Sequence, residues 1–387
     1  MHALIAPDKF KGSLTAAQVA EALALGITDA GRGWTATQLP IADGGDGTVA
    51  AAVATGWTRV GVAATGPTGR PLVAAYAVDG DRAVVELASV VGLSALPGSI
   101  PDPLGASTFG LGTMIAHALD HGARDIVIGI GGSSSTDGGA GLLQALGARI
   151  CDSEGMDVGR GGGQLLRAAR LDLTQLHPAL ANARLRVACD VDNPLLGPDG
   201  ATTVYGPQKG ATASDLAVLE IAMTNWAHVV ADAVGRDESE TPGAGAAGGT
   251  GLALFAALSA VPRPGIELVL ELVDFESRLA EADLVITGEG CLDAQTLHGK
   301  APAGVAAAAR RRGTPVLAVA GRSLLDDEQL HRAGIAAAYT LSDLEPDPQT
   351  SIANAAALLR ELGPRIVEET EHTRSTRQHH QATGAAS

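Results

Sequence analysis

Short apolar runs alternate with longer segments of helical periodicity along most of the chain. The apolar runs at residues 2–6, 283–290 and 314–321 each end in a loop rich in glycine or charge, as buried parallel strands do. Residues 301–312 carry the periodicity of a helix, and Thr15 precedes an Ala-rich helical segment as a candidate N-cap. This alternation of strand, crossover helix and strand predicts an α/β fold.

The two ends of the chain show the same alternation of strands and helices, and we expect them to form one Rossmann-like parallel sheet. The Gly-rich middle carries its own apolar runs and predicts a second α/β domain inserted into the first. The last residues are polar and aperiodic, which predicts disorder. Further strands are expected at 60–62, 72–78, 83–87, 125–131, 185–190 and 336–341, with helices near 139, at 252–261 and at about 350–369. The expected domains are 1–62 with 283–369, the insertion 63–282 and the tail 370–387.

Composition narrows the class of protein. The chain has 27 Lys and Arg against 43 Asp and Glu, a net charge of −16, which disfavours nucleic acid and anionic membranes as partners. Its 50 glycines suggest that backbone approaches something closely. Cys151, Cys189 and Cys291 form no CxxC pair, and no apolar run is long enough for a membrane span. We therefore expect a cytoplasmic protein that acts on small molecules.

A glycine-rich run, GIGGSSSTDGG, follows the strand expected at 125–131. The backbone N–H groups of Gly131 and Gly132, and hydroxyls beginning at Ser133, can cradle a phosphate beside a helix that starts near Gly139. A simple strand-to-helix turn would need fewer glycines, so we favour a phosphate site. The chain contains no Walker A sequence, and any ATP site would therefore lie outside the P-loop class.

Carboxylates and lysines occupy other loops at expected strand ends, where open α/β sheets bind ligands. Asp190 follows a strand and can accept a proton from a hydroxyl, with Asn193 orienting substrate or metal; turn capping is the alternative. Glu289, Asp293 and Lys300 together suit a Mg²⁺-bound nucleoside triphosphate.

Two loops near the N-terminus add further charge. Lys9 and Lys11 follow the first strand and precede a helix, either as an anion site or as surface charge. Asp43 and Asp46 flank two glycines, an arrangement that holds a hard cation or simply makes a turn.

Three other patterns are set aside. The match to GxGxxG that begins at Gly243 follows a polar loop and not a strand, so a Rossmann fingerprint is not expected. The serines after Gly132 lack the GxSxG pattern of a serine hydrolase. His117 and His121 have the spacing of two metal ligands but no third, so we interpret them as helix side chains.

Seven motifs follow one another along the chain: DKFKGS, ADGGDGT, GIGGSSSTDGG, CDVDNPL, GPQKGA, GAGAAGG and TGEGCLDAQTLHGKAP. This series resembles that of the bacterial glycerate kinases of the type I family, over about residues 6–321. The resemblance implies ATP-dependent phosphorylation of D-glycerate with Mg²⁺, and 2-phosphoglycerate as the product. It also implies two different α/β domains with the active site in the cleft between them. We also allow for a homodimer.

The resemblance implies roles for individual residues. Asp190 is the candidate base, and Lys300 is the second candidate catalytic residue. The family usually has DSFKGS where this chain has DKFKGS, which shifts substrate binding from Lys9 to Lys11 and Ser13. The other candidates are Asn193 and Lys209 for substrate, Gly131, Gly132, Ser133, Gly245 and Gly288 for the nucleotide, and Glu289, Asp293 and Asp43 for Mg²⁺.

Three alternatives remain open at this point. A glycerate 3-kinase would give 3-phosphoglycerate, and a kinase of another small hydroxy acid would share the same site chemistry. A non-catalytic sensor of a phosphorylated acid would need the glycines but not the several carboxylates, which makes it the least favoured of the three.

Overall fold

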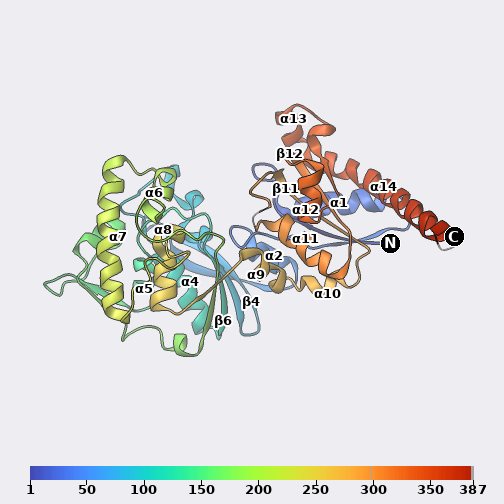
Figure 1. Ribbon diagram of the computed structural model, residues 1–387. Coiled ribbons are helices and arrows are strands. Elements are labelled where there is room, and N and C mark those ends of the chain that lie inside the picture. Colours follow the sequence, from blue (N-terminus) through green and yellow to red (C-terminus); the bar gives the residue numbers. More distant parts are fainter. Residues whose placement is uncertain (298, 385–387) are drawn as a thin grey trace. The chain divides into compact units, whose positions relative to one another are not determined.

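The computed structural model describes residues 1–297 and 299–384, with side chains described through residue 375. It is an α/β protein (Figure 1), which confirms the fold class. Contacts divide it into two compact units: unit 1 comprises Met1–Asp43 and the chain from Val269 onward, and unit 2 comprises Gly44–Leu268. The chain thus changes unit after Asp43 and Leu268, whereas we expected boundaries near residues 62 and 282.

Unit 1 contains a five-stranded sheet in which every pairing is parallel. The strand order is β13–β12–β11–β1–β2, so the two ends of the chain do form one sheet, as predicted. The strands are β1 (His2–Pro7), β2 (Thr35–Gln38), β11 (Leu284–Leu292), β12 (Val316–Ser323) and β13 (Ala337–Thr340). The sequence analysis missed the short β2.

The order of these strands creates a switch point between β1 and β11. Along the chain, the connection from β1 leads outward to β2, whereas the strands after β11 lead in the opposite direction. Pro7 pairs with Gly288, and the Asp8 N–H donates to the Gly288 carbonyl at 2.8 Å. Doubly wound sheets bind ligands outside the carboxyl ends of the strands at this point, so the loops after β1 and β11 hold the natural site of unit 1.

Helices cover both faces of this sheet. Helix α1 (Ala16–Asp29) begins at Thr15 with a capping box to Gln18, as the sequence indicated. It packs along α14 (Ala355–Gly384), and a Cβ on Gly26 would lie 2.2 Å from the Arg360 carbonyl oxygen, so only glycine permits this approach. Helix α11 (Ala301–Arg312) packs on β11 and β1. The other helices of unit 1 are α10 (Phe275–Leu279), α12 (Asp327–Ala333) and α13 (Pro348–Ala353), while α9 (Gly265–Leu272) spans the unit boundary.

The expectation of a disordered tail from residue 370 is wrong as far as Gly384. Helix α14 runs continuously from Ala355 to Gly384, and residues 385–387 lie outside the described part. Its first half is anchored by buried Leu359 and Ile366, and Glu371 accepts hydrogen bonds from Trp34 Nε1 at 3.0 Å and from Arg32 at 2.9 Å. Once a helix is nucleated, each added residue gains a hydrogen bond, so a polar, proline-free extension can remain helical.

Unit 2 contains a mixed six-stranded sheet in the order β10–β9–β6–β5–β4–β3. Strands β5, β6, β9 and β10 run parallel, so their carboxyl ends share one edge, whereas β4 pairs antiparallel with both β5 and β3. The strands are β3 (Thr58–Thr65), β4 (Pro71–Asp79), β5 (Arg82–Glu86), β6 (Asp125–Gly129), β9 (Arg184–Ala188) and β10 (Val261–Arg263). A separate pair consists of β7 (Arg149–Cys151) and β8 (Arg170–Asp172).

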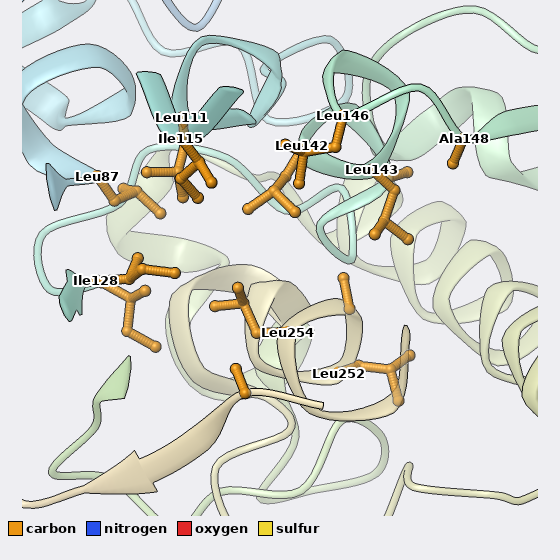
Figure 2. Close-up of a cluster of buried hydrophobic side chains, with 14 of the residues drawn as sticks. Leu87, Leu111, Ile115, Ile128, Leu142, Leu143, Leu146, Ala148, Leu252 and Leu254 are labelled. Carbon is orange, nitrogen blue, oxygen red and sulfur yellow. The ribbon is translucent and has the colours of Figure 1, made fainter. Parts of the chain in front are cut away.

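The core of unit 2 is aliphatic, as the composition required. Figure 2 shows Leu111 and Ile115 of α4 (Phe109–Asp120) close to Ile128 of β6, with Leu142 of α5 (Ala140–Ala145) beside them. Leu254 closes this cluster from the opposite side. The other helices are α2 (Thr48–Ala54), α3 (Ala88–Val91), α6 (Ala201–Tyr205), α7 (Ala213–Val234) and α8 (Ala246–Leu252). Short 3-10 helices lie at Leu93–Ala95, Pro97–Ser99, Gly162–Arg167, Pro178–Asn182, Pro207–Lys209 and, in unit 1, Leu341–Asp343.

The helix expected at 252–261 is a different structure. Helix α8 ends at Leu252, and Ala253–Ala257 continue as a π-helical turn. Ser259 adopts a positive φ of 53°, which ends the helical run, and strand β10 follows from Val261. An apolar run of this length suits a helix and a strand equally. None of the helices in the described ranges has the length and apolar character needed to cross a bilayer.

Candidate active site

A cluster of carboxylates lies at the switch point of unit 1. Asp8 follows β1, and its side chain is buried. Burial raises the pKa of Asp8 from 3.8 to about 6; Lys9 opposes this shift, while the negative charges of Asp43 and Glu289 add to it. The Lys9 N–H donates to Asp8 Oδ1 at 2.6 Å, and its Nζ lies 3.9 Å from the same oxygen. Three acidic groups therefore act on one another at the expected ligand-binding edge.

Glu289 is held between a hydroxyl and an ammonium group. Thr296 Oγ1 donates to Glu289 Oε1 at 2.6 Å, and Lys300 Nζ lies 3.3 Å from Oε2. Burial raises the pKa of Glu289, against the lowering effect of Thr296 and Lys300. Asp293 Oδ1 lies 3.9 Å from Lys300 Nζ. The structure thus brings together three of the residues that the sequence analysis grouped: Glu289, Asp293 and Lys300.

The two substrate candidates after β1 differ in their surroundings. Lys11 is exposed. Ser13 Oγ donates to the Ile352 carbonyl at 2.9 Å, so this hydroxyl ties the loop to α13. The backbone of Lys11 also comes close to β11, because a Cβ on Gly290 would lie 3.3 Å from the Lys11 nitrogen. Lys11 is therefore at the surface after β1, whereas Ser13 supports the loop.

The carboxylates of unit 1 have the chemistry that Mg²⁺ requires. No three Asp, Glu, His or Cys side chains among the described residues are close enough to hold a metal ion by themselves. Mg²⁺ usually takes only one or two protein carboxylates and completes its shell with water and substrate phosphates. Asp8 is buried and Glu289 is partly buried, and the two repel each other. A cation stabilises the ionised form of such carboxylates. The residues present therefore fit a Mg²⁺ ion that arrives with a phosphate ligand.

The glycine-rich loop of unit 2 opens to solvent only at its start. Gly131 and Gly132 are exposed, and Ser133 is 7% exposed, whereas residues 134–139 are buried. Ser134 Oγ donates to the Val91 carbonyl at 2.8 Å. Only residues 131–133 of the loop reach the surface. Of the serine hydroxyls that we expected to bind phosphate, those of Ser134 and Ser135 are buried.

The helix after this loop does not offer a free N-terminus to phosphate. Asp137, which is completely buried, accepts hydrogen bonds from Gly139 N at 3.3 Å and Gly141 N at 3.2 Å. Thr108 Oγ1 accepts from Leu142 N at 3.0 Å and donates to the Asp137 carboxylate. A carboxylate of the chain itself thus occupies the place that we assigned to a phosphate at this helix.

Lys209 supports the glycine-rich loop from within. Its side chain is 2% exposed, and Nζ donates to the Ser135 carbonyl at 2.5 Å. Burial lowers the pKa of Lys209 to about 7, and the charge of Asp137 opposes that shift. We expected Lys209 to contact substrate; in the structure its ammonium group contacts the backbone of the glycine-rich loop.

The loop after β9 carries two candidate site residues, Asp190 and Asn193, whose surroundings differ. Asp190 is exposed, and its Oδ1 accepts a hydrogen bond from Gly265 N at 2.8 Å. Asn193 has both ends of its amide engaged, because Nδ2 donates to the Asp199 carbonyl at 2.8 Å and Oδ1 accepts from Tyr205 at 2.6 Å. Asp190 is thus at the surface, while both ends of the Asn193 amide are used within the loop and its neighbours.

Two of the glycines expected at a nucleotide serve close packing. A Cβ on Gly245 would lie 2.1 Å from the Pro194 carbonyl oxygen, and one on Gly288 would lie 2.1 Å from the Val319 carbonyl oxygen. Both residues are buried. Each glycine is needed because a backbone carbonyl of its own unit leaves no room for a side chain.

Two carboxylates at these edges, Asp8 and Glu86, were not among the residues predicted from the sequence. Asp8 lies inside the quoted motif DKFKGS, but only its burial and its acidic neighbours distinguish it from a turn residue. Glu86 ends β5 and accepts from Gly47 N at 3.1 Å and Val49 N at 2.6 Å, so it holds the ADGGDGT loop. His298, in the last motif, lies outside the described residues.

His117 and His121, which we interpreted as helix side chains, lie side by side at the end of α4. Their rings stack with centroids 3.9 Å apart, and Tyr76 Oη lies 3.0 Å from His117 Nδ1. Burial lowers the pKa of His117, and the neighbouring His121 adds to the effect.

These features define an α/β enzyme that handles phosphate without a P-loop. The family model described as "Glycerate kinase family" matches residues 3–371, and the chain belongs to this family. It is 47% identical to "Glycerate kinase" of Bacillus subtilis (strain 168) over 88% of this chain and 90% of that protein. It is 43% identical to "Glycerate 2-kinase" of Escherichia coli (strain K12), again over 88% and 90% of the two chains.

A solved structure shows the same architecture. The crystal structure of putative glycerate kinase 2 from Salmonella typhimurium LT2 matches with a TM-score of 0.85 and 42% sequence identity. The match covers 97% of this chain and 99% of that one. The protein is therefore a kinase of the glycerate kinase class, as the motif series implied.

Proposed function

We propose that this kinase transfers the γ-phosphoryl group of ATP to the 2-hydroxyl of D-glycerate. Family membership supports the reaction, and the relative named glycerate 2-kinase, at 43% identity, supports the 2-position. The observation that carries the proposal is the cluster of Asp8, Glu289 and Lys300 at the switch point of unit 1. Carboxylates beside a lysine are the groups that phosphoryl transfer uses to position and neutralise a triphosphate.

The reaction forms one bond and breaks another. The glycerate hydroxyl oxygen bonds to the γ-phosphorus, and the bond from that phosphorus to the β,γ-bridging oxygen breaks, leaving its electron pair on ADP. The hydroxyl proton goes to a base, for which we propose Asp190, because it is exposed after a parallel strand and keeps its place through Gly265 N.

The remaining roles follow from charge and exposure. Lys300 and Lys11 would bind phosphate or the glycerate carboxylate, and the exposed N–H groups of Gly131 and Gly132 would bind phosphate. Glu289, with Asp293 and Asp43 nearby in unit 1, would hold Mg²⁺, which when bound neutralises phosphate oxygens. We assign Lys209, Asn193, Ser13, Gly245 and Gly288 to supporting the loops and strands that carry these groups.

The two units also support a proposal about organisation. We propose that unit 2 is a domain inserted into the Rossmann-like domain of unit 1, because each has its own sheet and its own apolar core. The contact boundaries at Asp43 and Leu268 would then mark the domain boundaries.

A coupled assay tests the reaction. The protein is incubated with ATP, Mg²⁺, D-glycerate and enolase, with and without phosphoglycerate mutase, and phosphoenolpyruvate is followed. Since enolase accepts only the 2-phosphate, we expect signal without mutase. Signal only with mutase would indicate a glycerate 3-kinase, and no signal in either mixture from folded protein would reject glycerate as substrate.

Replacing Asp190 tests the proposed base. Asp190→Asn keeps the acceptor oxygen for Gly265 N but removes the basic carboxylate, so we expect kcat to fall by about 10²–10⁴-fold with an unchanged melting temperature. Asp199→Asn, which neutralises an exposed carboxylate of the same loop, is the control and should keep its kcat. A kcat for Asp190→Asn within tenfold of the wild-type value would remove Asp190 from this role.

A further inference from the structure

The turn that follows β11 is organised by two of its own side chains. Asp293 Oδ1 accepts hydrogen bonds from Gln295 N at 2.8 Å and Thr296 N at 3.3 Å. The Thr296 N–H also donates to the Asp293 carbonyl at 3.0 Å. This is an Asx-type turn, and it commits one oxygen of the Asp293 carboxylate to the backbone.

Thr296 connects this turn to Glu289. Its side chain is completely buried, and Oγ1 accepts from Asp293 N at 2.9 Å. A threonine hydroxyl has a single proton, and here it is donated to Glu289 Oε1 at 2.6 Å. The hydroxyl has no proton left for any other acceptor, and its direction is set by the turn. The turn therefore holds the Thr296 hydroxyl in place, and that hydroxyl holds Glu289 Oε1.

We infer that Thr296 is a positioning residue that sets which oxygen of Glu289 is available to a phosphate-bound cation. With Oε1 engaged by the buried Thr296 hydroxyl, the other oxygen is Oε2, which accepts a hydrogen bond from Lys300 Nζ at 3.3 Å. The carboxylate oxygen and the ammonium group are thereby presented together. This inference rests on the proposed role of Glu289 toward Mg²⁺ and deepens it by one residue that none of the candidate sets contained.

The contrasting interpretation is that the hydroxyl only supports the turn. Two substitutions separate these interpretations. Thr296→Val keeps the shape but removes both hydrogen bonds of the hydroxyl, whereas Thr296→Ser keeps the hydroxyl and removes a methyl group. Loss of a group that orients a metal-binding carboxylate typically costs 10–100-fold in metal affinity or activity. A matched control is Thr340→Val at the end of β13 in the same unit, since Thr340 is 8% exposed and its hydroxyl lies 2.8 Å from Ser342 Oγ.

The experiment measures Mg²⁺·ADP binding by calorimetry, together with kcat, both KM values and the melting temperature. We expect Thr296→Val to weaken Mg²⁺·ADP binding by about 10-fold or more, with the KM for D-glycerate unchanged. Thr296→Ser should bind within threefold of the wild type, and Thr340→Val should bind like the wild type even where it melts earlier.

Two results would overturn the inference. The first is Mg²⁺·ADP binding by Thr296→Val within twofold of the wild type. The second is an equal loss of binding in Thr296→Ser, Thr296→Val and Thr340→Val. Such a loss would depend on the stability of each variant and not on the Thr296 hydroxyl. Because binding of Mg²⁺·ADP is measured without glycerate, the inference is tested even if the coupled assay rejects glycerate as the substrate.

Discussion

Asp8→Asn is expected to make the protein more stable at pH 7.5 and to abolish most of its activity. The folded state raises the pKa of Asp8 from 3.8 to about 6, chiefly through burial. A carboxyl whose pKa is higher in the folded state costs stability when it ionises, so the cost is absent below about pH 4 and complete above about pH 6. A shift of about two units corresponds to up to about 3 kcal/mol, which the neutral amide avoids.

Thermal unfolding between pH 4 and 8 checks this expectation. The stability of the wild type relative to Asp8→Asn should fall as the pH rises from about 4 to about 6 and then stay constant. We expect kcat/KM of the variant to fall by about 10–100-fold, because Asp8 lies beside the proposed metal-binding carboxylates Asp43 and Glu289, and loss of a group that orients a metal site typically costs this much. Glu21→Gln, an exposed carboxyl in the same unit, should leave both properties unchanged. A lower melting temperature for Asp8→Asn at pH 7.5 would contradict the argument.

Most strands and helices could be predicted because the spacing of apolar residues that indicates them lies within each segment. The run at 2–6 became β1, residues 301–312 became α11 without change, and Thr15 caps α1. Errors arose where the local signal is ambiguous. The apolar run after Gly251 fits either a helix or a strand, and the polar end of α14 has no apolar face to reveal a helix.

The candidate site was predicted in part, for a related reason. Glu289, Asp293 and Lys300 lie within twelve residues of one another, so their motif already placed them together. The importance of Asp8 depends on β1 pairing with β11, which is a contact across about 280 residues. Lys209 shows the opposite case, because a lysine in a glycine-bounded loop suggests a ligand, and only burial shows that its partner is the Ser135 carbonyl.

Gly248 is a position at which a single added methyl group should lower stability strongly. Its φ is +68°, and a Cβ there would lie 2.1 Å from the Ser135 carbonyl oxygen and 2.8 Å from Lys209 Nζ. Gly248→Ala therefore forces a left-handed conformation on alanine, at about 1–2 kcal/mol. It also displaces the carbonyl that Lys209 holds, and overpacking of this kind adds about 1–3 kcal/mol. We expect the free energy of unfolding to fall by about 3 kcal/mol.

Gly197→Ala separates the two contributions. Gly197 has a φ of +85° with nothing within 4 Å of the added Cβ, so this variant carries the backbone cost alone, about 1–2 kcal/mol. Urea unfolding of both variants gives the difference that belongs to the clash. Because the clash moves Ser135, and with it the loop that exposes Gly131 and Gly132, kcat/KM should fall in Gly248→Ala and remain near the wild-type value in Gly197→Ala. Equal stability of the two variants would contradict the prediction. It would show that the Ser135 loop moves away from a Cβ at position 248 with no loss of free energy, so that Lys209 does not hold this loop in a fixed position.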